Sequence, residues 1–239
     1  MIEYQSGEKL LRKNIMTKLK EIFWDLEKGS TKWSGYFDVY EKHLSKFIGK
    51  EPRILEIGVL GGGSIEMWQK YFGADTAVIG VDVNPACLEY KYDGDVQIIM
   101  GNQGDENFWK QFAEENGKFD IIIDDGGHTM DQQITTLKCM FPYLNDGGVF
   151  AVEDTHTSYW ANWGGGYKEP QTFLEYAKKL TDIVNQQHFQ GNNYILPTML
   201  ENYKGLYSTT FYNSMVVFEK ENLKEFGITD NRTMAGRDL

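Results

Sequence analysis

The 239-residue chain has few cysteines and no long apolar run, and each shortage excludes a class of protein. Cys87 and Cys139 lie far apart and form no CxxC motif, so we expect buried thiols in a reducing compartment, the cytoplasm. No apolar run approaches the roughly 20 residues that a membrane span requires. The first residues, MIEYQSGEKLLRKN, lack the apolar core of a signal peptide, so we expect no secretion.

Positive charge is also scarce. The sequence has 24 lysine and arginine residues against 35 aspartate and glutamate residues, which gives a net charge of −11. A protein that binds nucleic-acid phosphates favours a basic face, so we expect no nucleic-acid partner. Hydrophobic residues, by contrast, make up 41% of the chain and aromatic residues 14%, which favours a folded domain with a substantial core.

The spacing of apolar residues predicts two helices and then an alternation of strands and helices. The helices are expected over about residues 8–28, ended by Gly29 and Ser30, and over residues 36–47. Strands are expected over residues 53–58, 77–82, 96–100, 119–124 and 149–153. Further helices are expected over residues 64–72, 105–115, 130–144 and about 169–188, with a turn at residues 145–148.

This alternation predicts an α/β fold with a Rossmann-like, doubly wound and mostly parallel sheet that helices cover on both faces. Two more strand-like runs, residues 207–212 and 214–219, flank Asn213 and predict an antiparallel pair that completes the sheet. We therefore expect one domain, in which residues 1–50 form an N-terminal helical segment along a substrate wall and residues 51–239 form the cofactor-binding part.

The ends of the first three strands predict a cofactor pocket, because open α/β sheets bind ligands at the carboxyl ends of their strands. The first strand enters the loop EIGVLGGGS at residues 56–64, where glycines allow close backbone approach and the helix that begins at Ser64 offers free N–H groups. The second strand ends at Asp82, whose carboxylate can accept two hydrogen bonds from a ribose diol. Leu60 breaks the dinucleotide motif G-x-G-x-x-G. Asn102 and Gln103, after the third strand, either contact an adenine edge or belong to a capping loop.

Two acidic clusters follow the fourth and fifth expected strands, DDGGH at residues 124–128 and EDTH at residues 153–156. Each cluster alone is typical of a turn or a helix cap. Together they indicate a site, because neighbouring carboxylates repel one another unless a cation compensates them. Oxygen ligands of this kind select Mg²⁺ or Ca²⁺. His128 lies three residues after Asp125, so a helical turn would place both on one side.

Four segments, KWSGYFDVYE at residues 32–41, LEIGVLGGGS, IIDDGGH and EDTHT, together resemble the metal-dependent sugar O-methyltransferases. These are class I S-adenosylmethionine-dependent methyltransferases, and the relatives we can name act on deoxysugars of macrolides and of rhamnosylated polyketides. The resemblance covers about residues 32–160. It implies that Asp125, Glu153 and Asp154 hold Mg²⁺ and that His128 is the general base.

The same resemblance implies that Asp82 binds the ribose of the cofactor, that Asp124 faces its methionine end, and that Glu56 and Gly58 line its pocket. In the mechanism that follows, Mg²⁺ on the carboxylates would chelate two adjacent sugar hydroxyls and lower the pKa of the reacting one. The His128 imidazole would take the proton, because it titrates near neutral pH.

The acceptor site and three rival functions stay open. Tyr159, Trp160 and Trp163, in the loop YWANWGGGY, suit either stacking on a sugar ring or packing on the protein body. A catechol-type O-methyltransferase would also chelate a diol with Mg²⁺. A metal-dependent hydrolase or oxygenase would use Asp125, His128 and Glu153 as ligands, and a catalytically silent domain would only bind S-adenosylmethionine. The acceptor is a small molecule or a glycan in the favoured hypothesis, and relatives that often assemble suggest a homo-oligomer.

Overall fold

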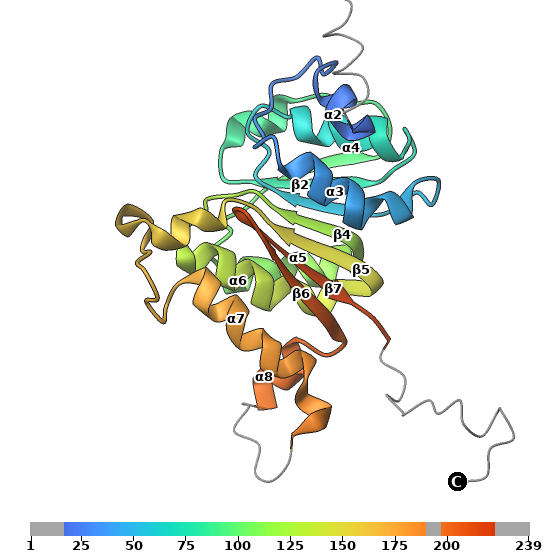
Figure 1. The fold of residues 1–239 in the computed structure, drawn as a ribbon. Coiled ribbons are helices and arrows are strands. Elements are labelled where there is room, and N and C mark those ends of the chain that lie inside the picture. The colour runs from blue at the N-terminus through green and yellow to red at the C-terminus, as the bar shows by residue number, and fades with distance from the viewer. Residues whose placement is uncertain (1–16, 190–196, 223–239) are drawn as a thin grey trace, which may run out of the picture.

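A single sheet forms the centre of the protein. The computed structural model describes residues 17–189 and 197–222, and within them seven strands follow the order β3-β2-β1-β4-β5-β7-β6 (Figure 1). The strands are β1 (Ile54–Ile57), β2 (Val78–Asp82), β3 (Val96–Met100), β4 (Phe119–Asp124), β5 (Leu144–Val152), β6 (Leu206–Tyr212) and β7 (Met215–Lys220). Strands β1 to β5 pair in parallel, whereas β7 pairs antiparallel with β5 and with β6.

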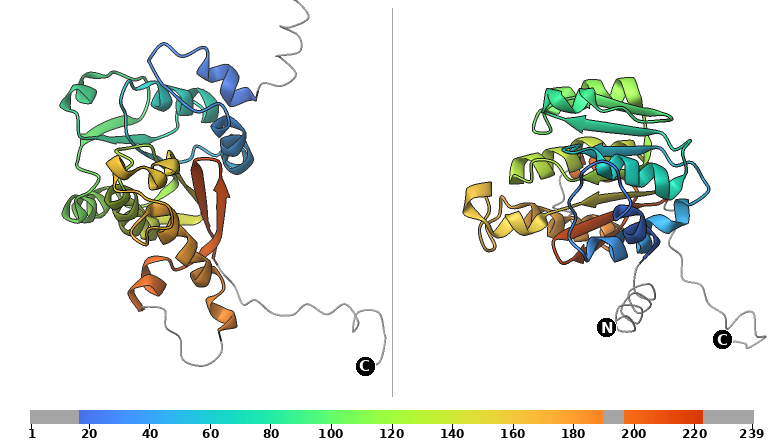
Figure 2. Two further views of the ribbon diagram at one scale, coloured as in Figure 1. Left: turned by 60° about the vertical axis from the view of Figure 1, so that its left-hand side comes forward. Right: turned by 90° about the horizontal axis from the view of Figure 1, so that it is seen from above.

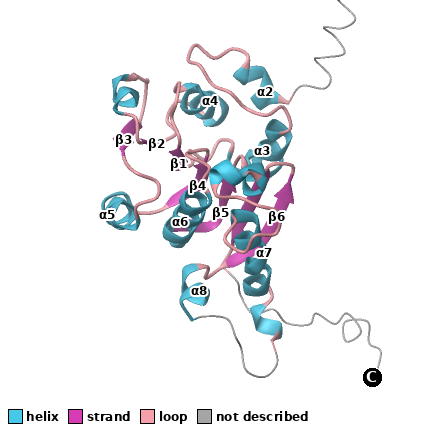
Figure 3. Ribbon diagram, turned by 90° about the vertical axis from the view of Figure 1, so that its left-hand side faces the viewer, coloured by secondary structure: helices cyan, strands magenta, loops and turns pink. Residues whose placement is uncertain are grey.

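Helices cover both faces of this sheet (Figures 2 and 3). The α-helices are α2 (Lys18–Phe23), α3 (Tyr36–Leu44), α4 (Gly63–Phe72), α5 (Glu106–Asn116), α6 (Met130–Met140), α7 (Phe173–Val184) and α8 (Pro197–Asn202). Short 3₁₀ helices are η1 (Ser45–Phe47), η2 (Pro85–Glu89), η3 (Phe141–Tyr143), η4 (Thr155–Tyr159), η5 (Ala161–Trp163) and η6 (Gln186–His188). Helices α2, α3 and α4 lie on one face, and α5, α6 and α7 lie on the other.

The apolar residues of the central strands supply both cores, because successive strand side chains point to opposite faces. Along β4, Ile122 joins the core that contains Trp109 of α5, whereas Ile121 joins the core that contains Trp68 of α4. Tyr36 of α3 belongs to the second core, so the described part of the N-terminal segment packs directly on the sheet. The predicted fold class, with its antiparallel C-terminal pair, is confirmed.

Several predicted boundaries were wrong. The expected turn at residues 145–148 is part of β5, whose first residue Leu144 pairs with Phe119 before a shift in register. Residues 8–16 of the helix expected over residues 8–28 lie outside the described residues. The described part forms α2, which ends at Phe23. Beyond this end, the Glu66 carboxylate accepts hydrogen bonds from the backbone of residues 27 and 28, at 3.0 Å each, and holds them in a non-helical loop. Helix α8 and the short helix η2 were not predicted.

The strand order reverses beside β1, where β2 and β4 flank it on opposite sides. The carboxyl ends of β1, β2, β4 and β5 therefore reach one edge of the sheet, which is the edge that binds ligands in this kind of fold. In the part of the chain that the structure describes, no helix has the length and apolar character needed to cross a bilayer.

Candidate active site

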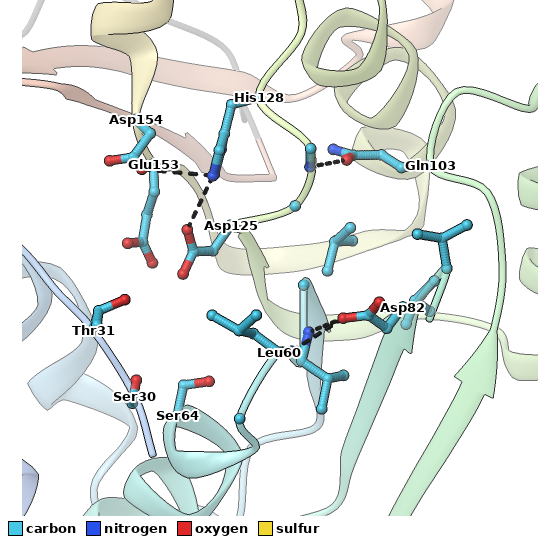
Figure 4. Close-up of a pocket in the computed structure, with 18 of the residues that line it drawn as sticks. Ser30, Thr31, Leu60, Ser64, Asp82, Gln103, Asp125, His128, Glu153 and Asp154 are labelled. Atoms are coloured by element: carbon cyan, nitrogen blue, oxygen red, sulfur yellow. Dashed lines mark hydrogen bonds and ion pairs between the residues drawn. The ribbon is translucent and has the colours of Figure 1, made fainter. Parts of the chain in front are cut away.

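A cavity of about 610 Å³ opens at this edge of the sheet (Figure 4). Its lining comes from the loop after β1, the ends of β2 and β3, the segments after β4 and β5, and residues 29–36 before and at the start of α3. A volume of this size lies in the range of small-molecule and cofactor sites. Of the residues predicted from the sequence, the following line it: Gly58, Ser64, Asp82, Asn102, Gln103, Asp125, His128, Glu153 and Asp154.

Asp82 shapes the glycine loop. One of its carboxylate oxygens accepts hydrogen bonds from the backbone N–H groups of Val59 and Leu60, at 2.8 and 3.0 Å, and the other accepts from Asn84 at 2.8 Å. Burial alone would raise the pKa of this carboxyl, but the three backbone N–H groups outweigh it and lower the pKa. Asp82 is therefore held ionised at the cavity wall.

The glycines of the loop allow another backbone segment of the protein, as well as a ligand, to approach closely. A Cβ atom on Gly61 would come within 2.4 Å of the Gly29 carbonyl oxygen, and the Gly63 N–H donates to that same oxygen at 3.0 Å. Residues 28 and 29 thus cross directly over the loop. Gly58 has a φ of +91°, and a Cβ atom there would lie 2.0 Å from the Asp125 carbonyl oxygen.

Glu56 and Asp124 lie beneath the cavity and not in its lining, because both are 0% exposed. Burial raises the pKa of each carboxyl to about 7. Trp68 donates to Glu56 at 3.1 Å, and Gln103 donates to Asp124 at 2.6 Å. One oxygen of each carboxyl has no hydrogen-bond partner among the described residues, so both groups hold unused hydrogen-bonding capacity.

The acidic clusters meet, as the sequence predicted. His128 Nε2 lies 3.7 Å from Asp125 Oδ1 and 3.5 Å from Asp154 Oδ2 (Figure 4). One ligand atom from each of these three residues falls within 4.8 Å of the others, an arrangement that could hold a metal ion. His128 and Asp154 both have positive φ values, 55° and 52°. Such backbone conformations cost about 1–3 kcal/mol and gather at functional sites.

Two aromatic side chains from the N-terminal segment hold Asp154. Its Oδ1 accepts hydrogen bonds from Trp33 Nε1 at 3.0 Å and from the Tyr36 hydroxyl at 2.7 Å. The same hydroxyl accepts from the Asp154 backbone N–H at 3.0 Å. The Oδ2 atom, which faces His128, is left free of these bonds.

Lys32 lies between Asp125 and Glu153, and the sequence had given it no role. Its Nζ is 2.5 Å from Asp125 Oδ2 and 2.6 Å from Glu153 Oε1, and its side chain is 1% exposed. Tyr40 also donates to the same Glu153 oxygen. Burial would lower the pKa of the Lys32 ammonium, but the charges of Asp125, Glu153 and Glu56 outweigh it and raise the pKa. No local pattern marks Lys32, because its partners lie 93 and 121 positions away.

Burial dominates the electrostatics of the remaining groups. It lowers the pKa of His128, although the charges of Asp125 and Asp154 oppose it, so the imidazole is neutral at pH 7. Burial, together with the charge of Asp125, raises the pKa of the Glu153 carboxyl well above its usual range. The neutral imidazole can accept a proton. Its Nδ1 atom is buried and has no hydrogen-bond partner among the described residues.

The three predicted substrate residues separate in space. Trp160 lines a second cavity of about 590 Å³, which shares Trp33 and Tyr36 with the first, while Trp163 packs 6.0 Å from the His128 ring. Tyr159 lines neither cavity. His156 stacks edge-on against Trp160 at 4.4 Å and bonds to Ser214, so it belongs to the wall of the second cavity.

The strand order, the glycine loop and the acidic edge define a class I methyltransferase fold. A family model described as "Methyltransferase domain" matches residues 55–155, which contain the loop and both acidic clusters. These residues thus match a methyltransferase domain, and the resemblance found in the sequence is confirmed.

The curated relatives are sugar O-methyltransferases. L-olivosyl-oleandolide 3-O-methyltransferase of Streptomyces antibioticus is 35% identical over an alignment of 208 residues, and the match covers 80% of this chain and 53% of that protein. Mycinamicin VI 2''-O-methyltransferase of Micromonospora griseorubida is 29% identical over 91% of this chain and 55% of its own length. The chain thus spans about half the length of the curated relatives it matches.

Solved structures of one methyltransferase have a similar fold. The MycE methyltransferase from the mycinamycin biosynthetic pathway, in complex with Mg and SAH, has a TM-score of 0.76 and 27% sequence identity. The match covers 94% of this chain and 58% of that one. A further structure of the same enzyme, with a TM-score of 0.70, contains mycinamycin VI in addition to Mg and SAH.

Proposed function

We propose that the protein is an S-adenosylmethionine-dependent O-methyltransferase that uses Mg²⁺ to methylate a hydroxyl of a sugar. The observation that carries the proposal is that the Asp125–His128–Asp154 group opens into the same cavity as the glycine loop. A methyl donor on the loop and a hydroxyl at the acidic group would thus share one space. The names of the relatives, which act on glycosylated macrolides, support a sugar acceptor.

The cavity supplies groups suited to the cofactor. Asp82 is the ionised group for the ribose diol, Ser64 and Gly58 line the loop, and Asn102 and Gln103 line the wall where an adenine would lie. Asp124 and Glu56 lie below the cavity, so their proposed role is to position the residues that donate hydrogen bonds to them. Asp124 accepts from Gln103 and from the Gly126 N–H, so it positions the segment between β4 and His128.

The acidic group fits a hard divalent cation, because Asp125 Oδ1 and Asp154 Oδ2 face one another across His128 Nε2. We propose Asp125 and Asp154 as ligands, with Glu153 as the third residue of the set that the resemblance implies. When bound, S-adenosylmethionine supplies an activated methyl group and Mg²⁺ increases the acidity of a hydroxyl that it contacts.

His128 is the proposed general base, with its Nε2 atom as the site that receives the proton of the acceptor hydroxyl. A positioned base of this kind contributes about 10² to 10⁴ in rate. The electrostatics favour the role, since burial keeps the imidazole neutral while Asp125 and Asp154 favour the protonated form once the proton arrives. Thr157 bonds to the His128 carbonyl oxygen at 2.8 Å and fixes the backbone of the base.

The acceptor would enter beside Trp33 and Tyr36, where the two cavities meet. Trp160 offers an aromatic face there, 49% exposed, on which a sugar ring can stack. Trp163 would act through His128, against which it packs. The cytoplasm is the proposed compartment, because Cys87 and Cys139 are both free thiols.

An acceptor screen tests the function. The protein is incubated with S-adenosylmethionine and Mg²⁺, together with nucleotide sugars, macrolide glycosides or catechols, and mass spectrometry detects a gain of one methyl group. We expect methylation of a glycoside or nucleotide sugar and its loss with EDTA. Turnover of catechols alone would identify a phenolic enzyme. Cofactor binding without turnover of any acceptor would identify a silent binding domain.

A further inference from the structure

The turn between β6 and β7 lies beside the acidic cluster. Strand β7 pairs antiparallel with β5, and Val216 lies opposite Val152. The same register, continued for two residues, places Ser214 of the turn opposite Asp154. The Thr155 N–H donates to the Ser214 carbonyl oxygen at 3.1 Å, so the contact between the two segments continues past the end of β5. The C-terminal strand pair therefore reaches the acidic edge of the sheet.

The Tyr36 hydroxyl joins this turn to Asp154. Its oxygen lies 2.7 Å from Asp154 Oδ1 and 2.9 Å from Ser214 Oγ, and it accepts from the Asp154 backbone N–H at 3.0 Å. A phenol has one proton, which forms its strongest hydrogen bond with an ionised acceptor. The hydroxyl therefore donates to the Asp154 carboxylate and accepts from the Ser214 hydroxyl. The Ser214 carbonyl oxygen, also 2.9 Å away, already accepts from Thr155.

These bonds fix the backbone and the side chain of Asp154 together. Its φ of 52° and ψ of 33° are left-handed, a conformation that a non-glycine residue keeps only where its surroundings hold it. One phenol oxygen binds both the N–H and the Oδ1 atom of Asp154, so a rotation of either part breaks a bond to the same hydroxyl. Trp33 Nε1 also donates to Oδ1, at 3.0 Å. The Oδ2 atom is thereby left to face His128 Nε2, at 3.5 Å.

The ring of Tyr36 gives this hydroxyl a fixed place. Tyr36 is the first residue of α3 and is 2% exposed, within the core that α3 shares with the sheet. Tyr40, one helical turn later, packs edge-on against it with 6.4 Å between the ring centroids. The hydroxyl therefore projects from a buried, packed ring to Asp154.

We propose that Tyr36 is a positioning residue that holds Asp154 as a metal ligand, and that the β6–β7 turn supports Tyr36 through Ser214. The inference rests on the metal site of the proposed function and adds the C-terminal strand pair to the parts of the chain that build it. Hydrogen-bond partners of a ligating carboxylate orient it, and their loss typically lowers metal affinity about 10- to 100-fold.

Calorimetric titration with Mn²⁺ alone, without cofactor or acceptor, tests this role. Tyr36→Phe keeps the ring and removes only the hydroxyl. We expect it to weaken Mn²⁺ binding at least fivefold, a smaller loss than is typical because Trp33 still holds Oδ1. Tyr203→Phe is the matched control, since Tyr203 is equally buried and its hydroxyl bonds to that of Tyr176 at 2.7 Å, but it lines neither cavity. It should lose a similar amount of stability in urea and bind Mn²⁺ as the parent does.

Ser214→Ala tests the part of the β6–β7 turn. We expect about threefold weaker Mn²⁺ binding, because the Tyr36 hydroxyl loses one of its partners. The double variant Tyr36→Phe/Ser214→Ala should bind Mn²⁺ as Tyr36→Phe does, since Ser214 acts through that hydroxyl. A further threefold loss in the double variant would show that Ser214 acts independently, which would overturn the proposed link.

The outcomes separate this inference from the proposed function. If Tyr36→Phe weakens Mn²⁺ binding less than fivefold, or if Tyr203→Phe weakens it equally, Tyr36 does not position Asp154, although the metal site stands. If the parent protein binds no Mn²⁺, the metal site of the proposed function is wrong, and the inference fails with it. Ser214 is only half-buried, so Ser214→Ala decides the question if Tyr36→Phe fails to fold. Unchanged affinity in Ser214→Ala would then contradict the inference.

Discussion

Gly58 is the residue whose freedom from a side chain matters most in the glycine loop. Its φ of +91° strains any other residue, and a Cβ atom would meet the Asp125 carbonyl oxygen at 2.0 Å. We expect Gly58→Ala to lower the free energy of unfolding by more than about 2 kcal/mol and to weaken S-adenosylhomocysteine binding. Urea unfolding and calorimetry measure the two effects.

Gly117→Ala is the control for this change, because Gly117 has a similar φ of +70° and nothing within 4 Å of an added Cβ atom. It should cost about 1–3 kcal/mol, from backbone strain alone, and leave cofactor binding unchanged. Equal losses of stability in the two variants would show that the contact with Asp125 does not constrain the loop.

Glu219 stabilises the contact between α3 and the C-terminal strand pair. His43 lies 3.4 Å from its carboxylate and Ser208 donates at 2.9 Å, and these partners lower the pKa of Glu219 from 4.5 to about 2. A lowered folded-state pKa gives stability that is present above pH 4.5 and is lost as the pH falls towards 2. We expect Glu219→Gln to cost about 1–3 kcal/mol at pH 7 and progressively less between pH 4.5 and 2.

Urea unfolding at a series of pH values measures this difference. Glu175→Gln is the control, because its surface ion pair with the half-exposed Lys178 should contribute under about 1 kcal/mol. A Glu219→Gln cost that stays constant from pH 7 to pH 3 would contradict the assignment of the ion pair to Glu219.

At the residue scale, the sequence predicted the partners that lie at strand ends. Asp125, His128 and Asp154 could be found because parallel strands bring their carboxyl ends to one edge, which places residues that follow different strands together. Lys32 could not be found, because it reaches the site from a segment outside the strand pattern. Glu56 was predicted to line the cofactor pocket and Asp124 to face the methionine end of the cofactor. Their burial beneath the cavity depends on three-dimensional packing that no local pattern encodes.

Helix α6 is the element that positions the proposed base. Thr129, directly after His128, is its N-cap and forms a capping box with Gln132. We expect Thr129→Ala to lower the free energy of unfolding by about 1 kcal/mol and to lower kcat, because the backbone of His128 loses its anchor. Urea unfolding and steady-state kinetics with the acceptor found in the screen measure these effects.

Thr172→Ala at the N-cap of α7 is the matched control. Thr172 also accepts a backbone hydrogen bond from its own helix, from Glu175, but it lines neither cavity. It should cost a similar amount of stability without a change in kcat. Equal kinetic losses in both variants would indicate a global effect and not positioning of His128.

At the element scale, strands were predicted better than helix ends. The boundaries of β3 and β4 agree with the prediction, because short apolar runs bounded by polar residues mark buried strands clearly. After α2 ends at Phe23, the backbone N–H groups of residues 27 and 28 donate two hydrogen bonds to the distant Glu66 carboxylate, a contact that no local pattern shows.

On the scale of the whole molecule, cofactor and metal should stabilise the fold together. The cavity joins the N-terminal segment to the ends of five strands, so ligands that bind there hold these parts in one arrangement. We expect S-adenosylhomocysteine with Mn²⁺ to raise the melting temperature more than either ligand alone. Differential scanning calorimetry of the parent and of Asp154→Asn checks this. If the ligand pair stabilises Asp154→Asn as much as the parent, the ion binds elsewhere.

The central claim places one divalent ion beside a methyl donor at the acidic edge of the sheet, and anomalous diffraction tests it most directly. Crystals grown with S-adenosylhomocysteine and Mn²⁺ should show an anomalous peak within coordination distance of Asp125 Oδ1 and Asp154 Oδ2. The cofactor should lie along the glycine loop, next to Asp82. A peak elsewhere, or cofactor density outside this cavity, would contradict the account.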